Sequence, residues 1–414
     1  MASPSIPTSY PKDQIKILLL ENIHPSAHAL FAREGFQVEA LSSALKEKEL
    51  IEKIRDVHVL GIRSKTQLRE LPIKEARRLL TIGAFCIGTN QIDLDCANVR
   101  GVPVFNAPFS NTRSVAELIL AEVIALSRQL GDRSRECHEG EWKKLASGSY
   151  EVRGKTLGVI GYGHIGSQIG VIAEMIGMNV IFYDRVTKLP MGNNRPMASL
   201  ADMLANSDFV TLHVPETAQT KNMIGAEELA MMKKGSFLLN ASRGTVVVIS
   251  ALADALRRGH LAGAAVDVYP EEPEANGGGF KSELQGLPNV ILTPHIGGST
   301  IEAQESIGRE VATSLIRFIN TGTTTGSVNF PHVDLAPAVG RETHRILNVH
   351  KNQPGVLRDI NKIVSDKNAN IEAQVLATDP QIGYLVMDIG SDVSEDVKHA
   401  IGSLPTSIKT RILY

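Results

Sequence analysis

The sequence predicts an α/β protein with two doubly wound parallel sheets and a smaller C-terminal module of order βαββαβ. Three observations support this fold class. Short apolar strands alternate with helix-period segments along most of the chain, a glycine-rich turn at residues 161–166 follows one of these strands, and the order of the alternation changes after residue 340. Parallel strands need crossover connections, so this alternation favours open sheets that are covered by helices.

Composition excludes several classes of protein. The 414 residues are enough for two to three domains. Lys and Arg number 43 against 45 Asp and Glu, so no general basic field attracts nucleic acid or an anionic membrane. Three cysteines are too few for a disulfide framework, and we expect them to be core thiols of a cytoplasmic protein. No apolar run reaches the length of a membrane span.

The expected elements follow one another along the chain. The first series has strands at 15–20, 57–62 and 79–83 and ends in a long helix from Thr112 to Arg135. The second series has six strands, at 156–160, 179–183, 209–213, 236–240, 263–268 and 290–293. The small polar run at 320–329 predicts a linker. The ferredoxin-like module then has strands at 343–349, 371–377, 384–389 and 407–413, with helices at 354–366 and 394–404.

The turn Gly161-Tyr162-Gly163-His164-Ile165-Gly166 has the spacing and context of a dinucleotide-binding turn. Its glycines allow the backbone to approach a pyrophosphate at the N-terminus of a helix, where free N–H groups stabilise the anion. Asp184 stands at the end of the next strand, where its carboxylate can accept hydrogen bonds from both ribose hydroxyls and would repel a 2′-phosphate. NAD is therefore favoured, and Arg185 leaves NADP as the alternative.

Side chains at three strand ends of the second sheet suit the dehydrogenation of a 2-hydroxy acid. Arg243, Asp267 and His295 follow strands whose carboxyl ends share one edge of the sheet. Arg243 can grip a carboxylate with its planar fork, and His295 can take the alcohol proton. Glu272 would hold the other ring nitrogen of His295 and raise its pKa. No metal is needed, because Arg243 and the imidazolium stabilise the developing charge.

Five segments carry a resemblance that covers essentially the whole chain. They are residues 86–91, 105–117, 161–166, 240–247 and 293–300, which read CIGTNQ, FNAPFSNTRSVAE, GYGHIG, NASRGTVV and TPHIGGST. On these motifs the chain resembles the D-isomer-specific 2-hydroxyacid dehydrogenases, and within them the short form that oxidises D-3-phosphoglycerate and ends in an ACT domain. The resemblance implies a catalytic set of Arg243, Glu272 and His295. It implies NAD contacts from Gly161, Gly163, His164, Ile165, Gly166, Asp184, His213, Val214, Pro215, Ala241, Ser242, Arg243, Asp267, His295, Ile296, Gly297 and Gly298.

The resemblance also implies the arrangement of the domains. Residues 1–110 and 302–335 would form a discontinuous substrate domain, with an NAD-binding Rossmann domain at 111–301 inserted in it and an ACT regulatory domain at 340–414. The residues alone indicate two tandem units and give no sign of this return of the chain. The crossing helices would be the hinges of a cleft that closes and excludes water.

The implied activity is NAD-dependent oxidation of D-3-phosphoglycerate to 3-phosphohydroxypyruvate, the first step of L-serine biosynthesis, in a homotetramer. Substrate contacts are expected from Arg63, Ser64, Lys65, Asn111 and Lys144. Family members resemble this chain but have Arg where Lys65 stands, so the bidentate grip on a phosphate is lost here. The ACT domain implies L-serine as an inhibitory effector, with contacts from His350, Asn352 and Asn370.

Several alternatives stay open at this point. The substrate could be an unphosphorylated 2-hydroxy acid, and 2-oxoglutarate could be reduced in a side reaction. The chain could be an NAD-sensing interaction protein, although the complete catalytic set argues against that function. The last module could pair with a second copy and bind nothing. Trp142, the only tryptophan, fits core packing and a subunit contact equally well.

Overall fold

The computed structural model describes residues 10–273, 277–336 and 343–414. Residues 337–342, which contain the expected start of the last domain, lie outside these ranges. The chain divides into two compact units. The outer unit consists of Met1–Ser110 and Gln304–Tyr414, and the inserted unit consists of Asn111–Ala303. None of the described helices is both long enough and apolar enough to cross a membrane.

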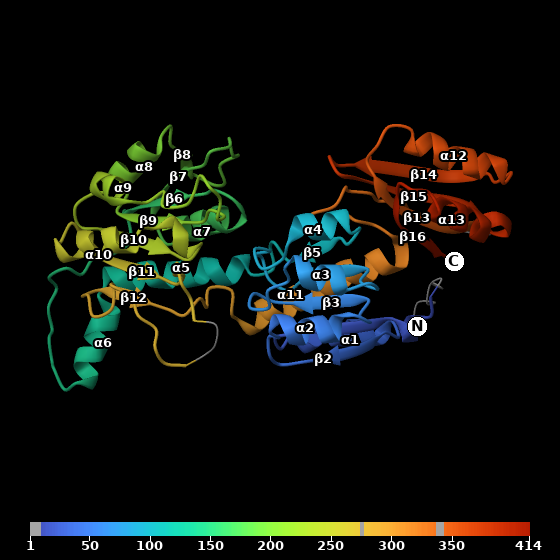
Figure 1. Ribbon diagram of the computed structural model, residues 1–414. Helices are drawn as coiled ribbons and strands as arrows, with labels where there is room; N and C mark the ends of the chain where they lie inside the picture. The colour runs from blue at the N-terminus through green and yellow to red at the C-terminus, as the bar shows by residue number, and fades with distance from the viewer. Residues whose placement is uncertain (1–9, 274–276, 337–342) are drawn as a thin grey trace. The chain divides into compact units, whose positions relative to one another are not determined.

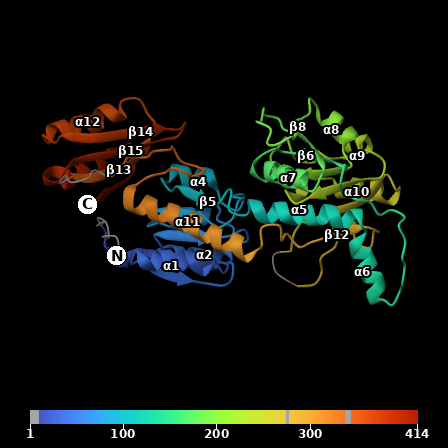
Figure 2. The ribbon, with the colours of Figure 1, turned by 180° about the vertical axis from the view of Figure 1, so that it is seen from behind.

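The outer unit begins with a five-stranded parallel sheet in the order β2-β1-β3-β4-β5 (Figure 1). Its strands are β1 (Lys16–Leu19), β2 (Gln37–Ala40), β3 (Val59–Ile62), β4 (Thr81–Ala84) and β5 (Val104–Asn106). The helices of this part are α1 (Pro25–Arg33), α2 (Glu47–Ile54), α3 (Glu70–Glu75), α4 (Leu94–Val99) and most of α11 (Ile301–Thr321), which lies across the sheet in Figure 2. The sequence prediction missed β2 and β5, because β2 is a largely exposed edge strand and β5 has only three residues.

A second sheet of the outer unit is antiparallel and has the order β14-β15-β13-β16. Its elements are β13 (Thr343–Lys351), α12 (Val356–Asp366), β14 (Ile371–Thr378), β15 (Ile382–Gly390), α13 (Ser394–Gly402) and β16 (Ser407–Leu413), which is the predicted βαββαβ order. Helices α12 and α13 cover one face and bury Ile346 and Met387 there (Figure 1). The opposite face, with Leu347 and Tyr384, shares one apolar core with α11 and the first sheet.

The polar run at 320–329 is not the free linker that its composition predicts. Thr324 is fully buried, and its hydroxyl donates to the Pro331 carbonyl at 2.6 Å. Ser327 forms a β-bridge with Phe105, and the Val104 N–H donates to the Asn329 side chain at 2.8 Å. Small hydroxyl side chains satisfy one another and the backbone here, so a polar composition is compatible with burial.

The inserted unit contains a parallel sheet of seven strands in the order β12-β11-β10-β9-β6-β7-β8. The strands are β6 (Thr156–Ile160), β7 (Asn179–Tyr183), β8 (Arg195–Pro196), β9 (Phe209–Leu212), β10 (Ser236–Asn240), β11 (Leu261–Val266) and β12 (Val290–Leu292). The six predicted strands are present, and the two-residue edge strand β8 was missed. The helices are α5 (Thr112–Ser127), α6 (Leu130–His138), α7 (His164–Met175), α8 (Leu200–Asn206), α9 (Ala226–Met231) and α10 (Ile249–Arg257).

The prediction of one helix from Thr112 to Arg135 was wrong. The helix breaks at Gln129, which has the left-handed backbone angle φ 51°, and α6 continues in a new direction (Figure 1). Polar contacts hold the break: the Gln129 amide donates to the Ser147 carbonyl at 3.0 Å, and the Asn289 N–H donates to Asp132 at 2.6 Å. None of the α6 residues is buried, so the apolar run that drives α5 onto the sheet ends before the break.

Candidate active site

The glycine-rich turn connects β6 to α7 in a geometry that only glycine permits. Gly161 has φ 89°, and a Cβ on it would lie 2.4 Å from the His213 carbonyl oxygen. A Cβ on Gly163, which caps α7, would meet nothing within 4 Å. The backbone at the start of α7 is therefore open to close approach by a ligand, and this turn fits the pyrophosphate of a dinucleotide. His164 and Ile165 begin α7, and Gly166 packs against the turn.

Asp184 follows β7 and lies directly beside this turn. Its Oδ2 accepts the Tyr162 N–H at 2.9 Å, and its Oδ1 accepts the Val186 N–H at 3.0 Å. These bonds orient the carboxylate and leave further acceptor capacity on both oxygens. Arg185, the residue that left NADP open, bonds to the Gln219 side chain. The donor and acceptor pattern therefore fits a ribose diol.

His213 follows β9 on the same sheet edge. Its Nε2 lies 2.8 Å from the Thr211 hydroxyl, and its buried Nδ1 has no hydrogen-bond partner within the described ranges. Burial lowers the pKa of His213 to about 3, so the ring is neutral. The other predicted cofactor contacts lie in the segments that follow β9, β10 and β12, namely Val214, Pro215, Ala241, Ser242, Ile296, Gly297 and Gly298.

Arg243 is held at the end of β10 by its neighbours. The Asn240 side chain donates to the Arg243 carbonyl at 3.0 Å and accepts from the Ser242 hydroxyl at 2.8 Å. One guanidinium nitrogen, Nη1, donates to the Ser242 carbonyl at 2.7 Å. Arg243 forms no ion pair with a described carboxylate, so most of its donors remain available for an anionic ligand.

The close approach of two chain segments brings the loop of Glu272 to Arg243. A Cβ on Gly244 would lie 1.9 Å from the Tyr269 carbonyl carbon, so the backbone at Tyr269 and Pro270 packs directly on this glycine. The Tyr269 N–H then donates to Oε1 of Glu272 at 3.1 Å. The charge of Arg243 is near enough to lower the pKa of Glu272.

Asp267 follows β11, and its buried carboxylate organises the turn that carries His295. It accepts from the Thr293 hydroxyl at 2.6 Å and from the Ile296 and Gly297 N–H groups, each at 2.8 Å. His295 itself has φ 55°, a left-handed conformation that is uncommon for residues other than glycine. The three hydrogen bonds to Asp267 hold the backbone on both sides of His295 in place.

The structure brings His295 and Glu272 together. Nδ1 of His295 lies 2.8 Å from Oε2 of Glu272, and both side chains are partly exposed. The hydrogen bond to Glu272 raises the pKa of His295, assisted by the charges of Glu272 and Asp267 and opposed by burial and by Arg243. Nε2 of His295 has no partner among the described residues, so it can exchange a proton with a ligand.

Two residues of this site were missed by sequence reasoning. Thr293 was seen only as the end of a strand, but its hydroxyl binds Asp267. Glu122 lies inside the predicted helix, where only 4% of its surface is exposed and Oε1 has no hydrogen-bond partner in the part of the chain that the structure describes. Burial and the charge of Asp267 raise the pKa of Glu122 to about 8. A charged residue among the apolar positions of α5 was the available signal for Glu122.

The predicted substrate contacts are divided between the two units. Arg63, Ser64 and Lys65 follow β3 in the outer unit, in a loop organised by Glu21. The buried Glu21 carboxylate accepts from the Lys65 N–H at 2.9 Å and from the Thr66 N–H at 2.8 Å. Asn111 and Lys144 belong to the inserted unit, Asn111 at the start of α5 and Lys144 on the exposed segment after α6.

The predicted effector contacts do not meet within one chain. His350 is buried, with Nδ1 3.0 Å from Oδ1 of Asn348, and Asn352 donates to the Asp379 carbonyl at 2.7 Å. Asn370 precedes β14, and the strand register places it at the opposite end of the sheet, because Ile371 pairs with Ile389 whereas His350 pairs with Gly383. The length of β14, roughly 23 Å, separates the two groups.

Comparison with known protein families identifies the inserted unit and the C-terminal module. Residues 120–297 match the NAD binding domain of the D-isomer specific 2-hydroxyacid dehydrogenases, and residues 346–409 match an AHAS small subunit-like ACT domain. The chain is 61% identical to D-3-phosphoglycerate dehydrogenase of Dictyostelium discoideum, across 98% of this chain and 99% of that one. The enzyme of the same name from Escherichia coli K12 is 52% identical, with the same coverage of 98% and 99%.

The fold comparison agrees with these assignments. A D-isomer specific 2-hydroxyacid dehydrogenase from Lactobacillus delbrueckii ssp. bulgaricus, solved in its NAD complexed form, is 26% identical with a TM-score of 0.66. It covers 76% of this chain and 100% of its own. The match to an NAD binding domain and the NAD complexed neighbour support NAD as the cofactor of this chain, which is the prediction made from the turn at Gly161 and the carboxylate of Asp184. The chain therefore belongs to the D-3-phosphoglycerate dehydrogenases, a family of NAD-dependent D-isomer-specific 2-hydroxyacid dehydrogenases with a C-terminal ACT domain.

Proposed function

We propose that this chain oxidises D-3-phosphoglycerate to 3-phosphohydroxypyruvate, the first step of L-serine biosynthesis. The observation that carries the proposal is the pair of His295 and Glu272 on the sheet edge that also holds Arg243 and the dinucleotide turn. A proton acceptor, a carboxylate-binding fork and a nicotinamide cofactor are what the oxidation of a 2-hydroxy acid requires. The relatives named D-3-phosphoglycerate dehydrogenase support this choice of substrate.

Arg243, His295 and Glu272 have separate roles in the proposed reaction. Arg243 binds the substrate carboxylate and polarises the C2 oxygen, because no described carboxylate pairs with its fork. Nε2 of His295 takes the proton of the C2 hydroxyl in the oxidation and returns it in the reduction. Glu272 orients the ring through Nδ1 and stabilises the imidazolium. The glycine-rich turn at residues 161–166 would hold NAD, which would supply the hydride acceptor for the oxidation at C2.

The phosphate group of the substrate is assigned to the loop after β3. Arg63 and Lys65 supply positive charge there, and Glu21 holds the backbone of the loop through its N–H groups. Lys65 contributes a point charge in place of a fork. 2-Oxoglutarate, whose distal carboxylate can replace the phosphate, is proposed as a slower substrate for reduction.

The phosphate assignment is tested by comparing kcat/KM for 3-phosphohydroxypyruvate and for hydroxypyruvate in NADH oxidation. We expect the phosphorylated substrate to be preferred at least 100-fold, since charge-assisted bonds to a dianion contribute about 3 kcal/mol. Lys65→Gln should reduce this ratio about tenfold. The matched control Lys53→Gln, an exposed lysine paired with Glu39, should leave it unchanged. Equal use of both substrates would contradict the assignment.

L-Serine is proposed as an inhibitory effector that binds between two ACT domains. His350 and Asn352 lie at one end of the sheet and Asn370 at the other, so one ligand can contact all three only if Asn370 comes from a second copy. Strand β14 is an edge strand and can pair with the same strand of that copy. Such a pair has the two-fold symmetry of most homodimers.

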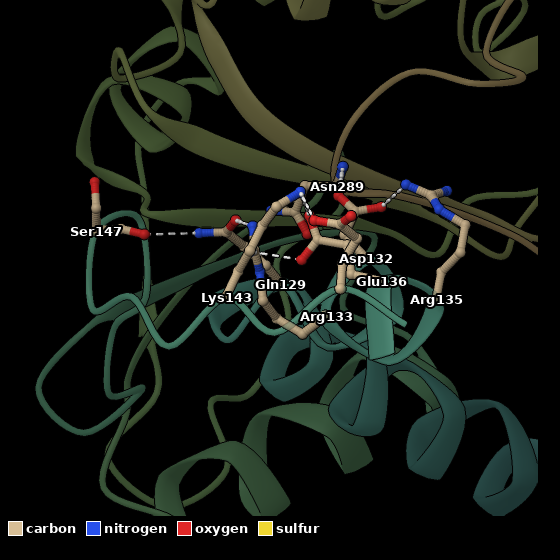
Figure 3. Close-up of polar contacts among 9 residues, drawn as sticks. Gln129, Asp132, Arg133, Arg135, Glu136, Lys143, Ser147 and Asn289 are labelled. Atoms are coloured by element: carbon tan, nitrogen blue, oxygen red, sulfur yellow. Dashed lines mark hydrogen bonds and ion pairs between the residues drawn. The ribbon is translucent and has the colours of Figure 1, made fainter. Parts of the chain in front are cut away.

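A homotetramer follows if the inserted unit supplies a second interface. Trp142 is 85% exposed and Leu145 65% exposed on the segment after α6, which excludes the core-packing interpretation of Trp142. Large exposed apolar side chains of this kind favour a protein contact. The Gln129 amide binds the Ser147 carbonyl of this segment, and Asp132 binds the Asn289 N–H and so holds the start of α6 in place (Figure 3).

A further inference from the structure

A buried glutamate lies next to the loop to which the substrate phosphate is assigned. Glu21 follows β1, and only 7% of its surface is exposed. Strands β1 and β3 are paired neighbours, with Leu19 opposite Gly61, and Glu21 and Arg63 each follow two residues later. The ends of the two strands therefore lie side by side, and this places Glu21 beside the loop at residues 63–66.

The backbone at Glu21 has an uncommon conformation. Glu21 has φ 63° and Asn22 has φ 54°, so two successive residues other than glycine are left-handed. This conformation is unfavourable for such residues and persists only where the surrounding contacts compensate for it. The Glu21 N–H donates to the Ser43 carbonyl and the Asn22 N–H donates to the Leu41 carbonyl, each at 3.2 Å. Strain of this kind at the functional edge of a sheet points to a role for the side chain that it places.

The Glu21 carboxylate accepts three backbone N–H groups of the loop. Oε2 accepts from Lys65 at 2.9 Å, and Oε1 accepts from Thr66 at 2.8 Å and from Arg63 at 3.3 Å. A carboxylate suits this task because both of its oxygens are acceptors, whereas an amide in its place would turn an NH₂ group towards one of these donors. Glu21 therefore fixes the backbone of the loop before any ligand binds.

The contacts with Glu21 leave the donors of the loop side chains unused. Glu21 accepts from the backbone of Arg63 and Lys65, and neither basic side chain forms an ion pair with a carboxylate in the described ranges. The Ser64 N–H also has no hydrogen-bond partner in those ranges, and Ser64 and Lys65 are exposed. Two cations, a hydroxyl and an N–H on one short loop suit the several acceptor oxygens of a phosphate.

Gln91 holds the other side of the same loop. Only 6% of its surface is exposed, and its Nε2 donates to the Arg63 carbonyl at 2.6 Å and to the Gly88 carbonyl at 3.3 Å. The backbone carbonyl of Gln91 accepts the Leu68 N–H at 2.8 Å. The peptide units on both sides of Arg63 are therefore fixed, one through its N–H by Glu21 and the other through its carbonyl by Gln91.

We propose that Glu21 and Gln91 are positioning residues for the recognition of the substrate phosphate. They hold the backbone of the loop so that Arg63, Ser64 and Lys65 present their free donors to one phosphate group. This role rests on the proposed assignment of the phosphate to the loop. Both residues act through the backbone of the loop, so their loss affects a substrate that carries a phosphate and spares one that lacks it.

The test measures kcat and KM for 3-phosphohydroxypyruvate and for hydroxypyruvate in NADH oxidation. We expect Glu21→Gln to raise KM for the phosphorylated substrate about tenfold and to change kcat less than about twofold. Both constants for hydroxypyruvate should stay within about twofold of wild type, whereas general damage to the fold would affect both substrates alike. The control Glu39→Gln removes an exposed acid of β2, paired with Lys53, and should change nothing.

A second comparison places Glu21→Gln in an Arg63→Gln/Lys65→Gln background. Because Glu21 acts through these side chains, its replacement should change kcat/KM for the phosphorylated substrate less than about twofold there. Gln91→Leu keeps the test valid if Glu21→Gln does not fold. In the wild-type background, Gln91→Leu should raise KM for 3-phosphohydroxypyruvate about fivefold and leave the constants for hydroxypyruvate unchanged.

The proposal is overturned if Glu21→Gln and Gln91→Leu leave KM for 3-phosphohydroxypyruvate unchanged, or raise KM for both substrates alike. It is also overturned if the effect of Glu21→Gln is undiminished in the Arg63→Gln/Lys65→Gln background. A lower KM in Glu21→Gln would overturn it as well, because Glu21 would then act by repelling the phosphate. Equal use of both substrates by the wild type would contradict the phosphate assignment itself, and the positioning role would fail with it.

Discussion

Nδ1 of His295 lies 2.8 Å from Oε2 and 3.1 Å from Oε1 of Glu272. The carboxylate thereby fixes which ring nitrogen exchanges the proton, because only Nε2 remains without a partner in the described structure. The same hydrogen bond raises the pKa of His295 and, against the effect of burial, lowers that of Glu272. The pair is therefore charged over a wider pH range than either side chain alone.

Glu272→Gln should move the pH profile of the oxidation. The base form of His295 exists above its raised pKa, so wild-type kcat/KM for oxidation falls as the pH drops through that value. Removing the charge lowers the pKa of His295 and shifts this acidic limb to lower pH. At pH 8 we expect turnover to fall by roughly 10- to 100-fold, because the ring loses its orientation.

Glu271→Gln is the matched control for this change, because Glu271 is the exposed neighbouring acid in the same loop. Profiles of kcat/KM against pH for all three proteins give the comparison. An acidic limb that stays in place in Glu272→Gln would show that another group controls it.

Arg243→Lys should weaken substrate binding and slow the chemical step together. Lysine keeps the charge but replaces a planar fork with a single ammonium group, so the two-point grip on the carboxylate is lost. We expect kcat/KM to fall by roughly 100-fold. Arg257→Lys, an exposed change on α10, should have no effect. Steady-state kinetics with both substrates varied makes the measurement, and unchanged kcat/KM would remove Arg243 from the carboxylate site.

Glu122→Gln should stabilise the protein at alkaline pH. The folded-state pKa of Glu122 is raised from 4.5 to about 8, so folding costs free energy once the unfolded chain releases this proton. The contribution of Glu122 to the free energy of unfolding is fully present below its unfolded-state pKa. This contribution declines as the pH rises towards the folded-state pKa of about 8. We expect Glu122→Gln to gain roughly 2–4 kcal/mol over wild type at pH 8 compared with pH 5.

Denaturant unfolding at the two pH values gives these free energies. The control is Glu117→Gln on the same helix, where the glutamate is exposed and pairs with Arg113. The difference between Glu122→Gln and wild type must grow with pH. A constant difference would mean that Glu122 is ionised in the folded protein.

Serine inhibition should be restored by mixing two defective chains. Asn352→Ala and Asn370→Ala should each raise the serine concentration for half-inhibition more than tenfold. In a mixed pair, however, one of the two sites would have both asparagines, because each site takes Asn352 from one copy and Asn370 from the other. Mixed pairs purified through two different affinity tags should regain sensitivity.

The control is a mixed pair in which both chains carry Asn352→Ala, which should remain insensitive. Inhibition assays on 3-phosphohydroxypyruvate reduction compare the two preparations. A site shared between copies would be contradicted if serine failed to inhibit the mixed pair of one Asn352→Ala chain and one Asn370→Ala chain.

Sequence reasoning located the elements that carry strong local signals. The βαββαβ module and the six main strands of the inserted sheet have continuous apolar runs between turn residues, so their existence is clear from the pattern. Edge strands such as β2 and β8 lack such runs. The break at Gln129 was invisible because its cause is a contact with Ser147 and a turn of the backbone, and neither leaves a periodic trace.

The candidate site also contains some features that the sequence predicts and others that it does not. Residues at strand ends, such as Arg243 and His295, could be predicted to converge because parallel strands share one carboxyl edge. The role of Asp267 as an anchor of the turn at residues 295–297 depends on backbone N–H directions, which sequence does not encode locally. Cys137, expected in the core, is exposed because α6 leaves the sheet after the break.

The most direct test of the proposed chemistry compares wild type with His295→Ala in NADH oxidation by 3-phosphohydroxypyruvate. NADH affinity is measured on the same preparations by fluorescence. We predict rapid turnover by the wild type, and a loss of roughly 10²- to 10⁴-fold in kcat for His295→Ala with NADH affinity changed less than about threefold. Near-normal turnover of His295→Ala, or no turnover by the wild type, would contradict the proposed site.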